Sequence, residues 1–211
     1  MIEQGAKDLY FAANRWLSRP NLALARLRYR APERPEGHYL HLGSGQTYIP
    51  GMINAEGNFL ARKDLWLDLR NPFPFPDASV FLLYCSHTLE HFVPTDAMRL
   101  LREMRRVLAP QGVARLAVPS FEHALAIAAG TAVSTWPRAF DDPHAQAVNF
   151  LFCDGQHKYA YSFALLDGFA REAGFASVEH YSATHGTAAK QYGAIRVGDE
   201  VEGSLVVELR P

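Results

Sequence analysis

Cysteine is scarce in this sequence, and neither sign of charge dominates it. The 211 residues include two cysteines, Cys85 and Cys153, which are far apart and form no C-x-x-C pair. This excludes a disulfide framework and a cysteine-based zinc site, so we expect a reducing compartment, the cytoplasm. Twenty-one basic and 22 acidic residues leave a net charge of −1. The basic field of a nucleic-acid-binding domain is missing, and we expect no nucleic-acid partner.

Long apolar runs are also lacking. The uncharged stretch over residues 124–137 is interrupted by Gly130 and ends at Pro137, whereas a membrane-spanning helix needs about 18 apolar residues. Lys7 and Asp8 break up the N-terminal region, which therefore has no apolar signal-peptide core. We expect a soluble protein without a transmembrane segment.

The composition is that of one globular domain preceded by a basic arm. Hydrophobic residues make up 48% and charged residues 20% of the chain, which excludes intrinsic disorder. Residues 1–35 hold seven basic and three acidic residues, a balance of +4, so the remaining residues carry −5. Leu9, Ala13 and Trp16 recur at helical spacing before Pro20. We predict a helical arm over residues 1–36 that packs on a domain of residues 37–211. Contact with a membrane surface or RNA is the alternative role of this arm.

Beyond the arm, strand patterns alternate with helix patterns. Strands are expected at residues 38–42, 52–56, 65–68, 80–85, 113–118, 175–181 and 204–209. Helices are expected from Thr95 to Leu108 and from Ser162 to Gly174, with a turn over residues 109–112. Such alternation predicts an α/β fold with a mostly parallel sheet.

The first expected strand ends in a glycine motif. Gly43-Ser44-Gly45 allows a ligand to approach the backbone, and Glu56 ends the next strand, where it can accept hydrogen bonds from a ribose. Glu56 follows Gly45 by eleven positions, whereas a dinucleotide site has its acid about 20 residues on, after a full helix. Pro50 and Gly51 exclude that helix. The spacing disfavours NAD.

Several motifs then follow in order. They are residues 42–45 (LGSG), 49–56 (IPGMINAE), 67–69 (LDL), 73–80 (FPFPDASV), 86–91 (SHTLEH), 101–112 (LREMRRVLAPQG), 155–159 (GQHKY) and 172–175 (EAGF). This series resembles class I S-adenosylmethionine-dependent methyltransferases, in particular the small type 11 group, over roughly residues 38–181. The resemblance implies a Rossmann-like, mostly parallel seven-stranded sheet with helices on both faces. It also implies S-adenosylmethionine as the cofactor.

The resemblance further implies where the cofactor lies. Gly43, Ser44 and Gly45 would pass under its methionine and ribose, and Glu56 would hold the ribose hydroxyls. Asp68 and Leu69 would face the adenine, while Cys85, Ser86 and His87 would lie beside the sulfonium. The sequence departs from the family at two positions. His41 stands where the family often has an acid that contacts the amino-acid part, and Thr47 replaces a third glycine.

The catalytic candidates are histidines and a tyrosine. His87 can act as a general base toward an acceptor hydroxyl. His157 and Tyr159 either line the acceptor pocket or belong to a surface turn. Residues 87–91 also match the H-x-x-E-H zinc pattern of inverted zincin peptidases. That site needs a sustained helix and a distant third ligand, and Pro94 interrupts the stretch, so we assign no metal.

We therefore interpret the chain as a methyltransferase for a small acceptor. The histidines favour an oxygen acceptor, which could be a sugar, a lipid-linked glycan or another metabolite. Residues 120–160 are the expected acceptor-side insertion, and the sequence does not predict an oligomeric state. Two alternatives stay open: a catalytically degenerate Rossmann-like binding or scaffold domain, and a zinc peptidase.

Overall fold

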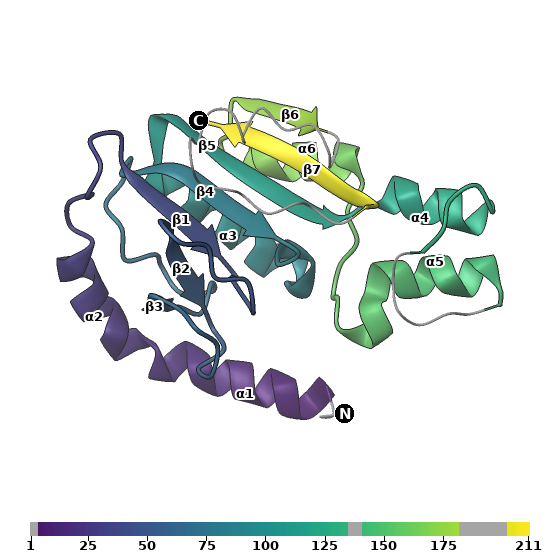
Figure 1. Ribbon diagram of the computed structural model, residues 1–211, viewed down its shortest axis with the longest axis horizontal. Helices are drawn as coiled ribbons and strands as arrows, with labels where there is room; N and C mark the ends of the chain where they lie inside the picture. The colour runs from purple at the N-terminus through teal and green to yellow at the C-terminus, as the bar shows by residue number, and fades with distance from the viewer. Residues whose placement is uncertain (1–3, 135–140, 182–201) are drawn as a thin grey trace.

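A computed structural model describes residues 4–134, 141–181 and 202–211 of the chain. Its centre is a seven-stranded sheet with the order β3-β2-β1-β4-β5-β7-β6 (Figure 1). The strands are β1 (His38–Leu42), β2 (Ile53–Glu56), β3 (Leu65–Trp66), β4 (Val80–Ser86), β5 (Leu108–Pro119), β6 (Ser177–Tyr181) and β7 (Ser204–Arg210). Strands β1 to β5 run parallel, whereas β7 is antiparallel to both β5 and β6. The predicted α/β fold with a mostly parallel seven-stranded sheet is confirmed.

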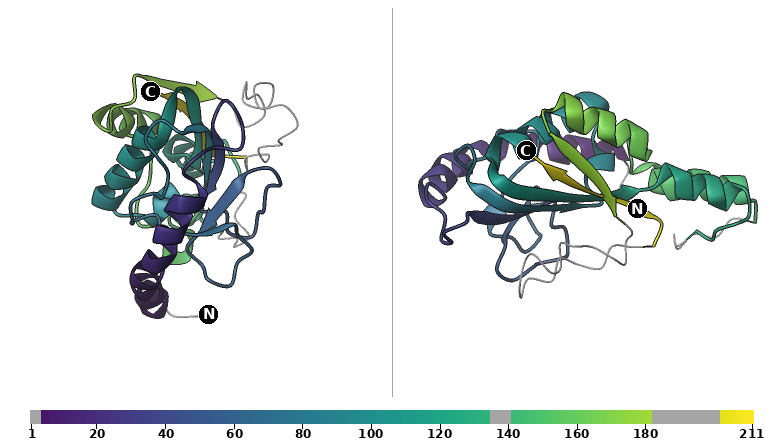
Figure 2. Two further views of the ribbon diagram at one scale, coloured as in Figure 1. Left: turned by 90° about the vertical axis from the view of Figure 1, so that its left-hand side faces the viewer. Right: turned by 90° about the horizontal axis from the view of Figure 1, so that it is seen from above.

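Helices form one covering layer and one projecting pair. They are α1 (Gln4–Leu17), α2 (Arg19–Arg28), α3 (Pro94–Val107), α4 (Phe121–Ala128), α5 (Pro143–Phe152) and α6 (Phe163–Glu172), with short 3-10 helices η1 (Leu89–His91) and η2 (Cys153–Gly155). The main core lies between one face of the sheet and α2, α3 and α6. The resemblance implies helices on both faces, but within the described residues the connections from β1 to β2 and from β2 to β3 contain no helix, so this is the face that helices cover. A smaller cluster on the other face includes Ile49 and Met52 from the loop after β1. Helices α4 and α5 pack on each other and extend beyond the sheet (Figure 2).

The N-terminal arm is helical, as predicted, but the apolar residues of its first helix do not face the domain. Leu9, Trp16 and Leu17 are exposed. The buried stripe consists instead of Asn14, Ser18, Leu22, Ala25 and Tyr29. The Asn71 amide donates to Arg15 O and to Ser18 Oγ, at 2.9 and 3.2 Å. Polar contacts therefore dock this part of the arm. Within the described residues, no helix is long and apolar enough to cross a membrane.

The structure corrects the predicted boundaries of α3, β5 and β3. Helix α3 begins at Pro94 rather than at Thr95, with Val93 as its N-cap, because proline suits the first helical turn, where its missing N–H costs no bond. The predicted turn over residues 109–112 lies inside β5 as an irregularity: Val80 pairs with Leu108, whereas Leu82 pairs with Val113. The third predicted strand is shorter than expected and ends at Trp66, before Asp68.

The C-terminal helix starts where the sequence predicts. Ser162 Oγ accepts a hydrogen bond from Leu165 N at 3.2 Å and so caps α6. Beyond the helix, Gly174 has a φ of +99°, a conformation that glycine adopts without steric cost. Both predicted end signals are confirmed.

Candidate active site at the carboxyl ends of the parallel strands

The candidate site lies where the chain leaves β1 and β4. These strands are neighbours, but the chain continues from β1 to β2 on one side and reaches β4 on the other, a reversal that creates a crevice at the carboxyl ends of an open sheet. The two loops touch at this point. A Cβ atom on Gly43 would lie 2.3 Å from Thr88 Oγ1, so Gly43 permits the contact between the loop after β1 and the loop after β4.

The glycine loop has the backbone conformation that its sequence predicts. Gly43 and Gly45 have φ of +63° and +51°, which L side chains seldom adopt. Among the described residues, a Cβ on Gly45 would meet only Gly43 O, at 3.9 Å, so this turn leaves room for a ligand. The Ser44 side chain is buried, and its hydroxyl has no hydrogen-bond partner among the described residues. The N–H of Thr47 closes a turn onto Ser44 O at 2.8 Å, and this turn does not require glycine there.

Glu56 is held against this loop. Its Oε2 accepts from Gly45 N and its Oε1 accepts from Asn58 N, each at 2.7 Å. A carboxylate oxygen has two lone pairs, so each oxygen can still accept a bond from a ligand hydroxyl. The geometry therefore provides a fixed, partly exposed carboxylate at the carboxyl end of β2.

The two residues expected at the adenine are already engaged. Asp68 is buried and binds the Arg70 guanidinium with both oxygens, at 2.9 and 2.5 Å. Leu69 is buried in the main core. The charge of Asp68 is therefore balanced by Arg70, and this ion pair fixes the chain that follows β3.

His41 is buried beneath the loop that follows β1. Its Nδ1 lies 3.1 Å from Asn54 Oδ1, and its ring packs 5.1 Å from that of Tyr84. Burial lowers the pKa of His41 below its ordinary value, although the hydrogen bond with Asn54 partly offsets this by raising the pKa. The Asn54 side chain also accepts a hydrogen bond from Ile49 N at 2.9 Å and donates one to Ile49 O at 3.0 Å. His41 thus helps to hold the loop over residues 43–52 in place.

The end of β4 presents three of the predicted residues in succession. Cys85 is fully buried, and burial raises the pKa of its thiol to about 12, so the thiol stays protonated. Ser86 is partly exposed, and His87 follows it in a left-handed conformation with a φ of +46°. Non-glycine residues in this region are uncommon and concentrate at functional positions. His87 Nε2 lies 2.9 Å from Ser204 Oγ at the start of β7.

The segment around His157 comes back to this strand end. The backbone oxygen of Glu90 accepts hydrogen bonds from Lys158 N and Tyr159 N, at 2.8 and 3.2 Å. His157 is buried, its Nδ1 lies 2.7 Å from Leu151 O, and burial lowers its pKa. The Tyr159 ring packs on Tyr161. The structure therefore brings His87 and His157 to one site and places the Tyr159 ring against the core.

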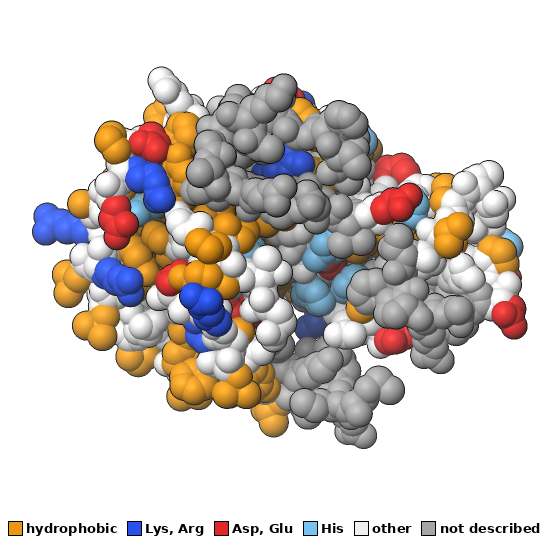
Figure 3. Space-filling model, in the orientation of Figure 1, with side chains coloured by type: hydrophobic (Ala, Val, Ile, Leu, Met, Phe, Trp, Pro, Cys, Tyr) orange, Lys and Arg blue, Asp and Glu red, His pale blue; other side chains and the backbone are white. Residues whose placement is uncertain are grey.

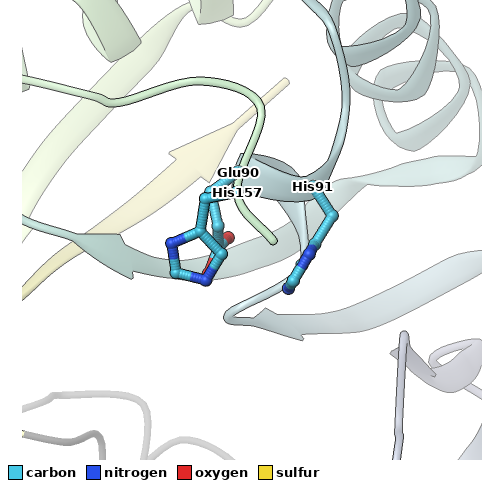
Figure 4. A group of neighbouring side chains, drawn as sticks. All are labelled: Glu90, His91 and His157. Carbon is cyan, nitrogen blue, oxygen red and sulfur yellow. The ribbon is translucent and has the colours of Figure 1, made fainter. Parts of the chain in front are cut away.

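Glu90 is the residue of this site that the sequence analysis did not select. It lies in η1 and is 1% exposed. His87 Nδ1 and His157 Nε2 lie 3.4 and 3.9 Å from its Oε1, and the rings of His91 and His157 are 4.8 Å apart (Figure 4). In the space-filling view, histidine side chains gather beside the projecting helices with an acidic side chain between them (Figure 3). Its place inside H-x-x-E-H was the only signal for Glu90.

Known proteins match both part of the sequence and the fold. The model of a methyltransferase domain family matches residues 47–116, which begin just after the glycine loop, while no curated protein matches the chain. An S-adenosylmethionine-dependent methyltransferase from Archaeoglobus fulgidus is 14% identical, over 90% of this chain and 94% of that one, with a TM-score of 0.50. One from Mesorhizobium loti is 16% identical, over 91% and 96%, with a TM-score of 0.51.

One of the similar solved structures is longer than this chain. A candidate O-methyltransferase from Nostoc punctiforme is 14% identical with a TM-score of 0.49, and the match covers 92% of this chain but 57% of that one. The resemblance that the sequence motifs indicated is confirmed. The chain contains a match to a methyltransferase domain and has the fold of class I S-adenosylmethionine-dependent methyltransferases.

Proposed function

We propose that this protein transfers the methyl group of S-adenosylmethionine to a small acceptor. The observation that carries the proposal is the meeting of the glycine loop with Glu56 at the carboxyl ends of β1 and β2. Two backbone N–H groups hold this carboxylate, and the turn at Gly45 leaves space next to it. A carboxylate that is fixed beside an accessible backbone can accept hydrogen bonds, and this suits a nucleoside whose ribose hydroxyls donate them.

The residues of the site fit the cofactor. Glu56 would accept from the ribose hydroxyls, and the unpartnered Ser44 hydroxyl would gain a polar partner. Asp68 and Leu69 remain the proposed adenine side, and Cys85 and Ser86 the proposed sulfonium side. When bound, the cofactor supplies an electrophilic methyl group. The buried Cys85 thiol is protonated and therefore does not compete as a nucleophile.

His87 is the proposed general base toward an acceptor hydroxyl. Its Nε2 already lies within hydrogen-bond distance of a hydroxyl, that of Ser204, and its Nδ1 faces the Glu90 carboxylate, which would stabilise an imidazolium. A general base contributes about 10²–10⁴ to the rate. Positioning of the acceptor is the larger effect, with effective molarities of about 10⁵–10⁸ M. His157 and Tyr159 would shape the acceptor side.

The acceptor class follows from this base. An oxygen acceptor is favoured, and sugars, lipid-linked glycans and hydroxylated metabolites all carry a suitable hydroxyl. Residues 120–160, which include the projecting α4 and α5, are the proposed acceptor-binding part. We keep the cytoplasm as the proposed location, since both cysteines are buried thiols.

Transfer of a labelled methyl group tests the proposal. The full chain is incubated with methyl-labelled S-adenosylmethionine and a set of hydroxylated sugars, glycan lipids and metabolites, and labelled product is expected for one class. His87→Asn should lower turnover about 10²-fold or more and keep the affinity for S-adenosylhomocysteine. His180→Asn, an exposed histidine of β6 replaced in the same way, is the control. Saturable cofactor binding without transfer to any acceptor would favour a binding or scaffold domain.

A further inference from the structure

Glu90 is a buried carboxylate that accepts no hydrogen bond from the described part of the chain. It is 1% exposed, and neither carboxylate oxygen has a hydrogen-bond partner among the described residues. Removing an ionised carboxylate from water is unfavourable unless a partner compensates its charge. Such a group therefore points to a positively charged partner in the immediate surroundings.

The histidines around Glu90 are held with one nitrogen turned away from it. His91 Nδ1 contacts Gln156 O at 3.2 Å, and His157 Nδ1 contacts Leu151 O at 2.7 Å. A carbonyl oxygen only accepts, so each Nδ1 carries the proton and donates. In a neutral imidazole the other nitrogen, Nε2, is then an acceptor.

This arrangement places acceptors opposite one another. His157 Nε2 lies 3.9 Å from Glu90 Oε1, which is too long for a hydrogen bond. One ligand atom from each of Glu90, His91 and His157 lies within 4.8 Å of the other two (Figure 4). Three lone-pair donors that converge without hydrogen atoms between them suit a metal cation.

We propose that Glu90, His91 and His157 form a binding site for a divalent transition-metal ion such as Zn²⁺. Two imidazoles and one carboxylate form a ligand set that zinc takes in sites with an open fourth position. Ligand atoms of a tetrahedral zinc ion lie roughly 3.3–3.5 Å apart, given metal–ligand distances of about 2.0–2.2 Å. The ligand atoms would therefore close by up to about 1.5 Å, given those metal–ligand distances, and the exposed His91 can provide most of this movement.

The surroundings are those of a metal site as well. Metal-binding histidines usually donate their other N–H to a backbone carbonyl or a carboxylate, which fixes the ring. Both histidines here do so. His87 Nδ1, 3.4 Å from Glu90 Oε1, would support the carboxylate from outside the ligand set. The ligands differ from those of the peptidase pattern, because His87 is turned toward Ser204 and the third ligand comes from a segment 67 positions (157 − 90) beyond Glu90.

The ion would join two parts of the chain. Glu90 and His91 lie in η1 after β4, whereas His157 follows η2, next to the projecting α4 and α5. Binding would fix the acceptor-side segment against the sheet. If the chain transfers methyl groups as proposed, the open coordination position of the ion would also bind an oxygen atom of the methyl acceptor.

Metal titration of the full chain tests the site. Protein freed of metal with a chelator is titrated calorimetrically with Zn²⁺, and with Co²⁺, whose visible absorption reports tetrahedral coordination. One equivalent should bind and raise the melting temperature. Glu90→Gln and His91→Asn should each weaken zinc binding by about 10²-fold or more, since loss of supporting residues alone costs about 10–100-fold. His180→Asn should bind as the wild type does.

Two results would overturn the site. The first is no saturable binding of either ion to the folded wild type, in which case Glu90 serves only to orient the histidines. The second is equal zinc affinity in the wild type, Glu90→Gln and His91→Asn, each shown to be folded by circular dichroism. S-adenosylhomocysteine is titrated in parallel samples. Zinc binding supports the site whether or not that nucleoside binds, so the two proposals fail separately.

Discussion

Replacing Glu56 by glutamine tests how the chain would hold the cofactor. The change keeps the shape of the side chain but removes its charge and turns one acceptor oxygen into a donor. One of the two backbone N–H groups, that of Gly45 or that of Asn58, then faces an amide NH₂ instead of an oxygen. A ribose hydroxyl loses its charged acceptor in the same step.

The magnitude follows from these bonds. A hydrogen bond to a charged group contributes about 1.5–3 kcal/mol. Loss of one such bond should weaken S-adenosylhomocysteine by about 10- to 150-fold, at about 1.4 kcal/mol for each tenfold. The unpaired backbone N–H should also lower the free energy of unfolding by about 1–3 kcal/mol. For a chain of this length each kcal/mol lowers the melting temperature by about 2–4 °C.

Calorimetry and thermal unfolding of the same samples separate the two effects. Glu172→Gln is the matched control, because this carboxylate lies on the surface of α6 in a pair with Arg102; it should change neither quantity. A Glu56→Gln protein that melts lower but binds the nucleoside within about threefold of the wild type would refute the reasoning. Glu56 would then serve only the glycine loop.

Four further substitutions test the fold. Gly43→Ala should destabilise the protein, because the new Cβ would clash with Thr88, whereas Gly45→Ala meets no such clash; urea unfolding that ranks them otherwise contradicts the contact between the two loops. Arg106→Ala removes hydrogen bonds to two carboxylates and two loop carbonyls and should lower the unfolding free energy by roughly 2–4 kcal/mol; a loss below about 0.5 kcal/mol would refute this. Burial raises the pKa of Glu103, but hydrogen bonds from Arg106 and a backbone N–H outweigh it and leave the pKa below its ordinary 4.5. The stability from Glu103 is then complete above that value and lost as the pH falls below it, so Glu103→Gln should unfold with a weaker acid dependence, measured by urea unfolding between pH 3 and about 7.

The sequence predicts the sheet well because its strands carry local signals. The apolar run of β4 and the glycines after β1 mark a strand buried on both faces and a tight turn. Boundaries set by other chain segments are less visible. The irregularity in β5 depends on its pairing with β4, and Gly112 allows it because a Cβ there would meet Val80 O at 2.8 Å.

The site is predictable only where its residues follow the strands directly. Gly45 and His87 are found from the strand ends, whereas the surroundings of Glu90 depend on a segment far along the chain. The H-x-x-E-H pattern suggests a helix with histidine on one face, but the structure forms one short 3-10 helix and takes His157 as the neighbour. Ser204 likewise reaches His87 through the antiparallel β7, which no local pattern indicates.

A crystal structure of the chain with S-adenosylhomocysteine tests the central claim most directly. We predict the nucleoside at the carboxyl ends of β1 and β2, with both ribose hydroxyls on the Glu56 carboxylate. Its sulfur should face the loop after β4, toward His87. A nucleoside bound elsewhere, or none at saturating concentration in a folded protein, would contradict the assignment of this strand edge as the cofactor site.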